Sequence, residues 1–568
     1  MEYSTLADRY EKLEAVASKL AKADIIGEFL KSIPSYELPK IVLLLQGRVY
    51  PSYSENELGI ATQMMIKSIS KASGFSAAKV EEIFKRTGDL GLTAEQCVKS
   101  KRQASLLKKK LTTDNVFENL QKLATIAGQG SQDKKFSLIA ELIISAQPKE
   151  ARYIVRTVLG ELRIGAAEGI IRDAIVKAFL ADEKSSKEEK EKATEAVENA
   201  WSLLNDYGEV AKIANEKGIK GLQKVGIQLG KPIQVMLGLA AEKIEDVVKE
   251  FGEIIAEYKY DGMRVVVEKK GNHFWLFTRR QEDVTKQFPD IVELAKKCLK
   301  ADECIVEGEV LGIDTKTGYP LPFQAMSQRV HRKYDIDRLV KEIPVQVNLF
   351  DVMYVNGTPL FNEPLIERRK ELARILKPIK GKFQLAKHII TGDVKKLEQF
   401  YGDAVEGKQE GLMLKVPNAP YVFGRHVGTM YKIKPVMENL DLVIIGAIWG
   451  EGGRTKWLTS YELACRDPNT GKFLSCGMMS TGLNEDEYEL MTKELKKIII
   501  SENGKIVIVK PKIVLEVGYQ EIQKSPNYES GFGLRFPRFV RVRDDKGPDE
   551  ADTITRVKKL YSSQGKAG

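Results

Sequence analysis

The stretch from Glu257 to Arg264 contains the residues of this 568-residue chain that are best suited to chemistry. It reads Glu-Tyr-Lys-Tyr-Asp-Gly-Met-Arg, with Lys259 between two tyrosines and a carboxylate two residues away on either side. A lysine amine becomes a nucleophile when nearby cations and partial desolvation favour its neutral form. A solvent-exposed lysine, the usual case, fits the local sequence equally well. The choice depends on whether the other parts of such a site follow along the chain.

Five later motifs place charged residues at the ends of apolar, strand-like runs. They occupy residues 278–282, 306–311, 349–357, 410–415 and 431–435. Side chains alternate between the two faces of a strand, so Glu307 and Glu309 share a face, as do Lys432 and Lys434. Each motif alone is most simply a solvated strand edge or a structural ion pair. Together they provide cations for phosphates, carboxylates for Mg²⁺ and an aromatic face for a base, as a nucleotide site requires.

Strands must position these residues. Two apolar runs, 254–256 and 265–267, flank the lysine, and Asp261-Gly262 between them is a turn signal. The pattern predicts a strand, a short turn and a second strand, as in a hairpin. Further strands are predicted at 265–268, 274–278, 304–311, 345–354 and 411–416.

The chain before these strands, up to about residue 220, has helical apolar spacing, as at Leu13 and Val16. Segment 150–169 predicts a helix that ends at Gly160, then a glycine-flanked turn with Arg163 and Gly165, then another helix. Backbone N–H groups at a helix start suit phosphate contacts when arginines lie beside them. An ordinary packing turn fits the local sequence equally well. Glycines between 217 and 238 indicate a connection between domains.

The chain after residue 441 is divided into short β-rich segments, 442–448, 460–465, 506–509 and 513–518, by Gly and Asn turns. This pattern predicts a small OB-type barrel, which needs about five strands. Near its end, Arg535, Arg538, Arg541 and Arg543 form a concentrated cation patch. A solvated basic tail is the simple interpretation, but interleaved apolar residues from Phe536 onward indicate that the stretch is anchored to a core.

Length and composition limit the number of domains, the kind of partner and the cellular compartment. A prior of about 150 residues per domain predicts three or four units, and the net charge of +10 with a pI of about 8.9 favours a polyanionic partner. The five cysteines are scattered and never in C-x-x-C spacing, which indicates neither disulfides nor a zinc site and fits a reducing compartment. No apolar run reaches membrane-spanning length, so we expect no membrane association and a cytoplasmic protein.

The order of the motifs resembles that of the covalent nucleotidyltransferases: K-x-D-G at Lys259, R-x-x-E at Arg279, F-D-x-x-Y-x-N-G at Phe350, E-G-x-x-x-K at Glu410 and K-x-K at Lys432. Within that superfamily the chain resembles the ATP-dependent DNA ligases of the archaeal and eukaryotic replicative type. The resemblance covers essentially the whole length. The Arg-Ile-Gly turn at 163–165 resembles part of the family's DNA-binding domain, and residues 535–544 resemble its final motif.

The resemblance implies an architecture and a reaction. We expect an all-α DNA-binding domain at 1–225, an α+β nucleotidyltransferase (adenylation) domain at 226–436 and a C-terminal OB-fold β-barrel at 437–568. The implied activity is the ATP-dependent sealing of nicks in duplex DNA, joining 3′-hydroxyl to 5′-phosphate through lysyl-AMP, in replication, recombination and repair. ATP is then the substrate, Mg²⁺ or another divalent metal the cofactor, nicked double-stranded DNA the partner, and the protein a monomer.

The resemblance also assigns roles to single residues. Lys259 would attack the α-phosphorus of ATP as the free amine, although an ordinary lysine has a pKa of about 10.4. Nearby cations, including Mg²⁺, would favour that neutral form. Glu257 would accept a hydrogen bond from adenine, and Phe350 would stack on its ring. The other implied contacts are with ribose and phosphates (Arg264, Arg279, Arg425, Lys432, Lys434), with metal or ribose (Glu309), with metal (Glu410), with pyrophosphate (Arg535, Arg538) and with DNA (Arg163, Gly165).

Three features depart from the family pattern. Met430 stands where a tryptophan is usual, and by strict spacing His426 rather than Arg425 takes the place of an arginine before it. The stretch from Gln103 to Leu107 resembles a sliding-clamp-binding box but lacks the two aromatics that fill the clamp pocket. A solvated basic face is the simpler interpretation of that stretch.

Other functions share part of this pattern. RNA ligases and mRNA-capping guanylyltransferases have the lysine motif, but the long helical N-terminal region argues against both. Use of NAD⁺ is disfavoured because the chain has no cysteine quartet for a zinc finger. A non-catalytic DNA-binding scaffold would have no need for Lys259 together with both carboxylates and the motif lysines.

Overall fold

The computed structural model describes residues 1–563 except positions 55, 57, 101–109, 127, 129, 183, 322, 331, 333, 334, 425, 435–437, 452 and 453. The chain divides into two compact units. The first comprises Met1–Leu239, Asp261–His388 and Lys415–Tyr431, and the second Ala240–Tyr260, Ile389–Leu414 and Lys432–Gly568. The expected clamp-binding stretch at 103–107 and the family arginine position at Arg425 lie outside the described residues.

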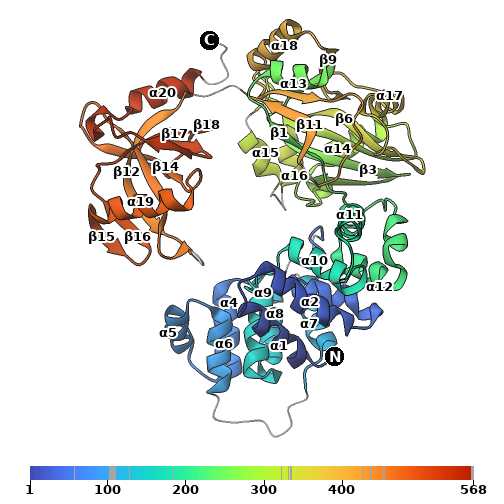
Figure 1. The fold of residues 1–568 in the computed structure, drawn as a ribbon, viewed down its shortest axis with the longest axis vertical. Coiled ribbons are helices and arrows are strands. Elements are labelled where there is room, and N and C mark those ends of the chain that lie inside the picture. The colour runs from blue at the N-terminus through green and yellow to red at the C-terminus, as the bar shows by residue number, and fades with distance from the viewer. Residues whose placement is uncertain are drawn as a thin grey trace. The chain divides into compact units, whose positions relative to one another are not determined.

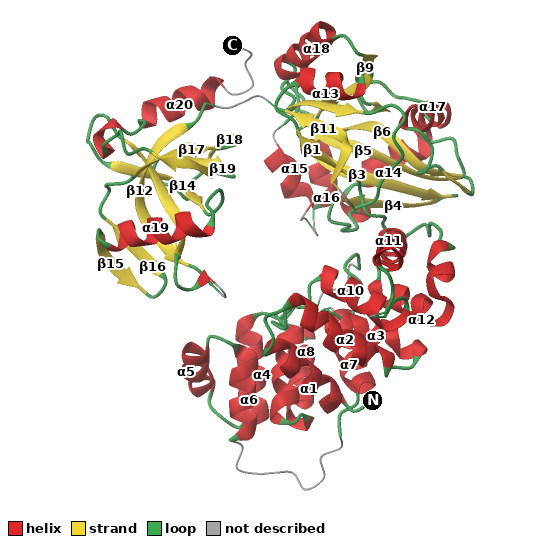
Figure 2. Ribbon diagram, viewed as in Figure 1, coloured by secondary structure: helices red, strands yellow, loops and turns green. Residues whose placement is uncertain are grey.

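The N-terminal part of the first unit is helical, as predicted (Figures 1 and 2). Its α-helices are α1 (Tyr3–Glu14), α2 (Lys19–Lys31), α3 (Leu38–Leu45), α4 (Thr62–Ser73), α5 (Ala77–Thr87), α6 (Leu90–Lys99), α7 (Thr113–Thr125), α8 (Ser131–Ser145), α9 (Pro148–Val158), α10 (Glu168–Phe179), α11 (Lys187–Leu204) and α12 (Tyr207–Gln223). Helix α12 extends past Gly218 and Gly221, the first two glycines of the predicted connection, with one non-helical residue at Gly218.

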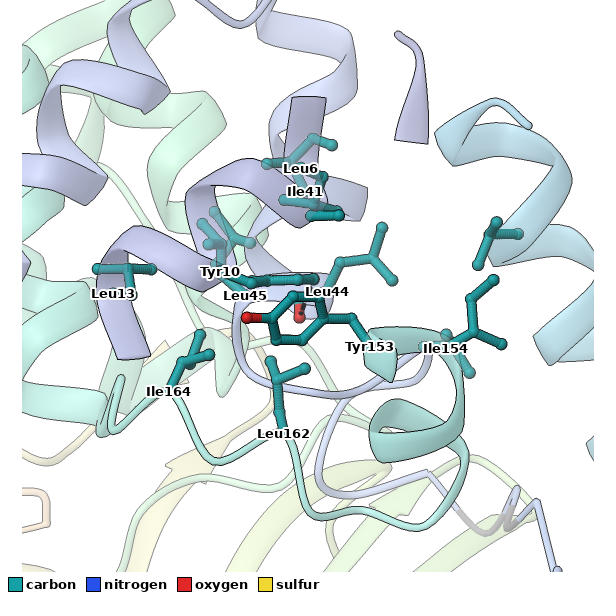
Figure 3. Close-up of a cluster of buried hydrophobic side chains, with 14 of the residues drawn as sticks. Leu6, Tyr10, Leu13, Ile41, Leu44, Leu45, Tyr153, Ile154, Leu162 and Ile164 are labelled. Atoms are coloured by element: carbon teal, nitrogen blue, oxygen red, sulfur yellow. Dashed lines mark hydrogen bonds between the residues drawn. The ribbon is translucent and has the colours of Figure 1, made fainter. Parts of the chain in front are cut away.

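One part of the core of this helical region is built from α1, α3, α9 and the turn that follows α9 (Figure 3). Tyr10 and Tyr153 pack with their ring centroids 5.0 Å apart, and the Tyr10 hydroxyl donates to the Leu44 carbonyl at 2.7 Å. Leu162 and Ile164, from the turn, are buried against the same cluster. Apolar anchors therefore fix a segment that has no regular secondary structure.

A six-stranded sheet forms the β core of the first unit. Its order is β4-β3-β5-β6-β7, and β8 pairs in parallel with β6. The strands are β3 (Met263–Lys270), β4 (His273–Thr278), β5 (Glu303–Gly312), β6 (Val345–Val355), β7 (Thr358–Pro359) and β8 (Phe383–Leu385), with helices α14 (Pro289–Cys298), α15 (Phe323–Val330), α16 (Ile336–Glu342) and α17 (Leu365–Ile375) in the same region. The predicted strands of this region are confirmed to within a few residues.

Strand β6 carries two irregularities in its pairing with β5. Val306 pairs with Val352 and Glu307 with Asp351, but Gly308 pairs with Leu349, so Phe350 has no opposite residue. An extra residue of this kind bends the strand and re-aims a side chain. The aromatic residue of the third motif is therefore set apart from the regular alternation.

The lysine-bearing strand belongs to a second sheet, of order β1-β11-β10-β2-β9. Its strands are β1 (Leu237–Ala240), β2 (Ile254–Lys259), β9 (His388–Thr391), β10 (Gly411–Lys415) and β11 (His426–Ile433), and helices α13 (Ile244–Phe251) and α18 (Val394–Glu406) belong to the same part of the chain. The expected hairpin around Asp261-Gly262 is wrong: β2 and β3 are strands of different sheets. The turn is short as predicted, but it joins two sheets.

The C-terminal part of the second unit is rich in β-structure. A seven-stranded sheet has the order β14-β13-β12-β16-β15, with β17 paired to β12 and β20, and β18 pairs with β19. The elements are β12 (Leu440–Trp449), β13 (Leu458–Arg466), β14 (Phe473–Met479), β15 (Ile499–Asn503), β16 (Ile506–Val509), β17 (Val514–Gly518), β18 (Glu521–Lys524), β19 (Phe532–Arg535), β20 (Arg538–Val542), α19 (Glu485–Lys496) and α20 (Ile554–Ser563). The strands outnumber the five expected because polar segments such as β15 also pair; the OB-type barrel stays a prediction.

A buried carboxyl docks the segment that precedes β1. Glu268 is fully buried on β3, and one of its oxygens accepts from the Gly230 amide at 2.7 Å. Gly230 has φ +89°, and a Cβ there would lie 3.2 Å from the Trp275 ring. Burial raises the pKa of Glu268 to about 8, and the charge of Asp283 adds to the effect, while the Gly230 amide opposes it.

Glu268 should make folding stability fall as pH rises. Its folded pKa of about 8 exceeds its usual 4.5, so between these values the folded protein holds a proton that the unfolded chain releases. We expect Glu268→Gln to remove this pH dependence. Its free energy of unfolding relative to that of wild type should increase by on the order of 4 kcal/mol between pH 5 and pH 8. Calorimetry at both pH values measures the difference in Tm. A difference in Tm between variant and wild type that stays constant with pH would contradict the raised pKa of Glu268.

Among the residues that the structure describes, no helix combines the length and the apolar character needed to cross a bilayer.

Candidate active site

Lys259 is the last residue of β2, and strand topology brings Glu410 to it. Strand β10 lies beside β2, and the Glu410 amide, just before β10, donates to the Lys259 carbonyl at 2.8 Å. The Glu410 carboxylate forms ion pairs with the ammonium groups of Lys259 and, at 2.7 Å, of Lys434. Three motif residues from three parts of the sequence therefore meet. Glu257, on the same strand as Lys259, is 2% exposed.

The two lysines determine the charge state of Glu410. Burial alone would raise the pKa of this carboxyl, but the ammonium groups of Lys259 and Lys434 outweigh burial and lower the pKa to about 2. Since this lies below the usual 4.5, the ion pairs stabilise the fold above pH 4.5 and lose that effect as pH falls toward 2. At neutral pH Glu410 is an anion that holds two cations.

Arg264, on β3, is fixed by a second set of contacts in the first unit. Its guanidinium pairs with Glu307 and donates to the Met236 carbonyl at 2.7 Å. Glu307 is fully buried and also accepts from the Tyr421 hydroxyl at 3.0 Å. Burial alone would lower the pKa of Arg264, but the charge of Glu307 outweighs it and raises that pKa. Arg264 is therefore a preorganised cation at one end of the sheet.

Phe350 presents its ring to two cations. The Arg264 guanidinium lies 5.6 Å and the Lys415 ammonium 4.3 Å from the ring centroid. Lys415 is only 5% exposed. Cations at such distances are attracted to the negative face of an aromatic ring. Arg264 and Lys415 therefore hold the Phe350 ring in place. Arg264 is also a cation expected to contact the ribose and phosphates.

The other expected nucleotide residues lie on or beside other strands of the two sheets. Glu309 is directly opposite Arg264 in the β3–β5 pairing and is half-buried. Arg279 follows the end of β4 and is exposed, and Lys432 is half-buried on β11. Met430, at the position of the usual tryptophan, is 4% exposed.

The final motif lies on β19, β20 and the turn between them. Arg535 pairs with Glu521 at 3.1 Å and Arg538 is exposed, whereas Arg543 pairs with Asp441 at 2.7 Å. Phe539 is 7% exposed and anchors the stretch, whereas Phe536 and Val540 are 65% and 46% exposed, so the apolar residues from Phe536 onward are anchored only in part. A solvated basic tail is therefore the wrong interpretation.

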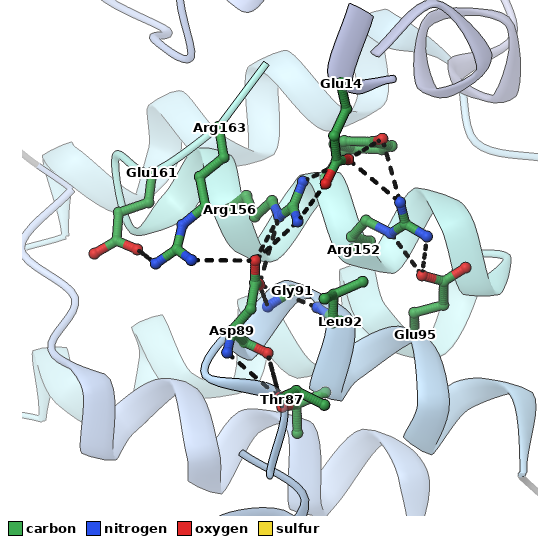
Figure 4. A network of polar contacts seen from close by, with 12 residues as sticks. Glu14, Thr87, Asp89, Gly91, Leu92, Glu95, Arg152, Arg156, Glu161 and Arg163 are labelled. Carbon is green, nitrogen blue, oxygen red and sulfur yellow. Dashed lines mark hydrogen bonds and ion pairs between the residues drawn. The ribbon is translucent and has the colours of Figure 1, made fainter. Parts of the chain in front are cut away.

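The Arg163 turn lies beside a buried polar network (Figure 4). Arg156 is 3% exposed and binds Asp89 at 2.8 Å and Glu14 at 2.9 Å. Asp89 also caps α6 through the Gly91 and Leu92 amides. Burial alone would raise the pKa of Asp89, but Arg156 outweighs it and lowers that pKa. Arg163 reaches the rim of this network, 3.5 Å from Asp89 and paired with Glu161.

Comparison with known proteins decides the family. Three family models match: "DNA ligase N terminus" at residues 2–176, "ATP dependent DNA ligase domain" at 235–434 and "ATP dependent DNA ligase C terminal region" at 454–546. A DNA ligase of Nanoarchaeum equitans is 47% identical over 99% of both chains, and one of Thermococcus onnurineus is 43% identical over 99% of this chain and 98% of its own. The chain belongs to the ATP-dependent DNA ligase family.

A solved structure named "Pmar-Lig_PreS3" has the same fold at 18% identity, with a TM-score of 0.55, covering 94% of this chain and 99% of its own. The helical N-terminal region, the central adenylation domain and the β-rich C-terminal region predicted from the sequence are those of a DNA ligase. Within the described residues no cluster of three or more His, Cys, Asp or Glu side chains is arranged to hold a metal ion by itself.

Three further residues contact the candidate residues, directly or, for Tyr421, through Glu307, and were not assigned to the site from the sequence. Glu307 was placed beside Glu309 by alternation, but its burial and its contacts with Arg264 and Tyr421 were not foreseen. Lys415 ends a recognised motif, which was a signal for it. Tyr421 follows a proline in an irregular segment, and nothing in its local spacing marks it.

Proposed function

We propose that the chain seals nicks in duplex DNA with ATP, through an AMP group carried on Lys259. The observation that supports it most is the trio of Lys259, Glu410 and Lys434 within the region that matches the ligase domain. In the first step the Lys259 Nζ attacks the α-phosphorus of ATP. A P–N bond forms, the bond to the β-phosphate breaks, and pyrophosphate leaves with the electron pair.

The attacking nitrogen must first lose its proton. The Lys259 ammonium forms an ion pair with Glu410, and this ion pair must open before the nitrogen can attack. Glu309 and Glu410 are oxygen donors of the kind that Mg²⁺ takes beside substrate phosphates, and we propose both as metal contacts. When bound, a divalent metal would supply positive charge that neutralises the phosphates.

Two transfers complete the reaction. The AMP moves from Lys259 to the 5′-phosphate at the nick, forming a pyrophosphate linkage and freeing the amine. The 3′-hydroxyl then attacks the activated 5′-phosphorus, a phosphodiester forms, and AMP leaves. Covalent catalysis of this kind divides one difficult step into easier ones.

The remaining side chains bind and orient the nucleotide in this proposal. Buried Glu257 accepts from the adenine amino group, and Phe350 stacks on the base. Positively charged side chains bind the ribose and the negatively charged phosphates, or orient the negatively charged pyrophosphate. These are Arg264, Arg279, Arg425, Lys432 and Lys434 for the nucleotide, and Arg535 and Arg538 for the pyrophosphate.

Loss of the Phe350 ring should weaken ATP binding selectively. Base–aromatic stacking contributes about 1–3 kcal/mol, so Phe350→Ala should raise the KM for ATP roughly 5- to 100-fold. Phe350→Tyr, which keeps the ring, is the matched control. Steady-state formation of the labelled adenylate measures both. A KM for Phe350→Ala equal to that of wild type would show that the ring only packs against Lys415.

We propose the domain bounds 1–225, 226–436 and 437–568 because three separate hydrophobic cores support them. One core lies between Tyr3 and Leu222, one between Met263 and Phe383, and one between Leu440 and Leu560. The first domain would bind nicked DNA through Arg163 and Gly165. We propose a monomer, with sliding-clamp binding through Gln103 to Leu107 as an additional contact.

One experiment tests the function. The protein is incubated with ATP, GTP or NAD⁺, each labelled in the AMP or GMP portion, with Mg²⁺, and nicked DNA is then added. We expect covalent label from ATP alone and its transfer to the nick. Label from GTP or NAD⁺ alone, or label that passes to nicked RNA but never to nicked DNA, would overturn the proposal.

A further inference from the structure

Lys22, on α2, is a buried cation that forms no ion pair with any described carboxylate. The residue is 8% exposed, and its ammonium donates to the Ile164 carbonyl at 2.5 Å. Within the described ranges no carboxylate lies within ion-pair distance of it. Two neighbouring lysines differ in this respect: Lys31, also on α2, pairs with Glu28 at 2.8 Å, and Lys177, on α10, pairs with Asp24. Buried charges are normally paired, so the unpaired ammonium of Lys22 needs an explanation.

The ammonium lies against the turn proposed to bind DNA. A Cβ added to Gly165 would lie 2.5 Å from the Lys22 nitrogen, and Gly165 has φ +67°. The turn alternates: Leu162 and Ile164 are buried, while Arg163 and Gly165 face solvent. Lys22 therefore holds the carbonyl of the turn's last buried residue and reaches the position beside its exposed glycine.

Arg163 and Lys22, the two cations at this turn, differ in the contacts that each must break to bind an anion. Arg163 is already paired with Glu161 and with Asp89, so a phosphate would have to replace carboxylates (Figure 4). Among the described residues, the ammonium of Lys22 contacts a neutral carbonyl and no carboxylate, which leaves two of its three N–H donors for another acceptor. An arriving phosphate would compensate the buried charge of Lys22 without breaking an ion pair.

We propose that Lys22 is a phosphate-binding residue of this protein, acting with Arg163 and the Gly165 backbone on one phosphodiester of duplex DNA. The proposal rests on the proposed function and extends its DNA contacts to α2, more than 140 residues before the turn (Ile164 lies 142 residues after Lys22). Lys22 supplies a charge that is fixed in place before DNA arrives, which reduces the ordering needed on binding.

The test uses the full chain and a labelled nicked duplex with a 3′-dideoxy end, so that binding is measured without sealing. Fluorescence anisotropy gives the affinity between about 50 and about 200 mM salt. Lys22→Met keeps the apolar stem and removes the charge. We expect its affinity to fall roughly tenfold and the slope of log K against log salt to decrease in magnitude by about 0.9, the value for one phosphate contact. Lys31→Met, on the same helix, should keep the wild-type slope.

The other outcomes distinguish a structural role of Lys22 from a role in DNA binding. Weaker binding by Lys22→Met with an unchanged slope and a lower Tm would show that Lys22 only supports the Ile164 carbonyl, and would overturn the proposal. Wild-type affinity and slope in Lys22→Met would overturn it also, while nick binding by the protein would stand. If wild type itself shows no salt-dependent binding to nicked DNA, the proposed function fails rather than this contact.

Discussion

We expect Lys259→Ala to form no detectable covalent adenylate and its nick-sealing activity to fall roughly 10⁴-fold or more, as for removal of a covalent nucleophile. Alanine cannot form the P–N bond, and no other group can carry AMP to the DNA. Denaturing gels of protein incubated with α-labelled ATP and Mg²⁺ measure the label directly. Nicked DNA that has been adenylated chemically beforehand separates the steps, because sealing it does not require the Lys259 amine to become adenylated.

The control for this variant is Lys249→Ala, which removes an exposed lysine from α13 in the same unit. It should keep wild-type labelling. Lys259→Ala also frees Glu410 from one of its two cations, so its Tm must be compared with wild type. Covalent label of wild-type intensity in a folded Lys259→Ala protein would place the nucleophile elsewhere and remove the central assignment.

The sequence marks candidate residues of the site but says little about their surroundings. Residue types at fixed spacing mark Lys259, Phe350 and Glu410, because the chemistry needs those groups in that order. The pairing of Glu410 with Lys259 required a fact that spacing does not contain, namely that β10 lies beside β2. Strand neighbours separated by 150 residues are determined by packing of the whole domain, not by a local pattern.

The same limit explains the errors. The turn at Asp261-Gly262 was recognised, yet a turn signal does not say which sheet receives the next strand, and the expected hairpin was wrong. The buried contacts of Tyr421 and Lys22 are also non-local: each reaches a partner more than 100 residues away. The helical character of the chain up to about residue 220 was predicted because apolar periodicity is local and is repeated over many turns.

Glu410→Gln tests whether the carboxylate serves only as a lysine partner or also as a metal contact. The two roles predict opposite effects. If Glu410 only held Lys259 in an ion pair, removing its charge would release the Lys259 side chain and adenylation would accelerate. We propose that it also contacts the metal, so we expect adenylation to slow roughly 10²- to 10³-fold, as when a preorganised electrostatic contact is lost. The Mg²⁺ concentration for half-maximal rate should increase.

The rate of single-turnover adenylation, followed across pH and Mg²⁺ concentration, measures both quantities. Glu406→Gln is a matched control, because it removes an exposed carboxylate four residues away at the end of α18. It should leave the rate and the Mg²⁺ requirement unchanged. A faster Glu410→Gln enzyme with an unchanged Mg²⁺ requirement would leave Glu410 as an ion-pair partner alone, and the anion that two lysines hold at pKa about 2 would then restrain Lys259 rather than assist it.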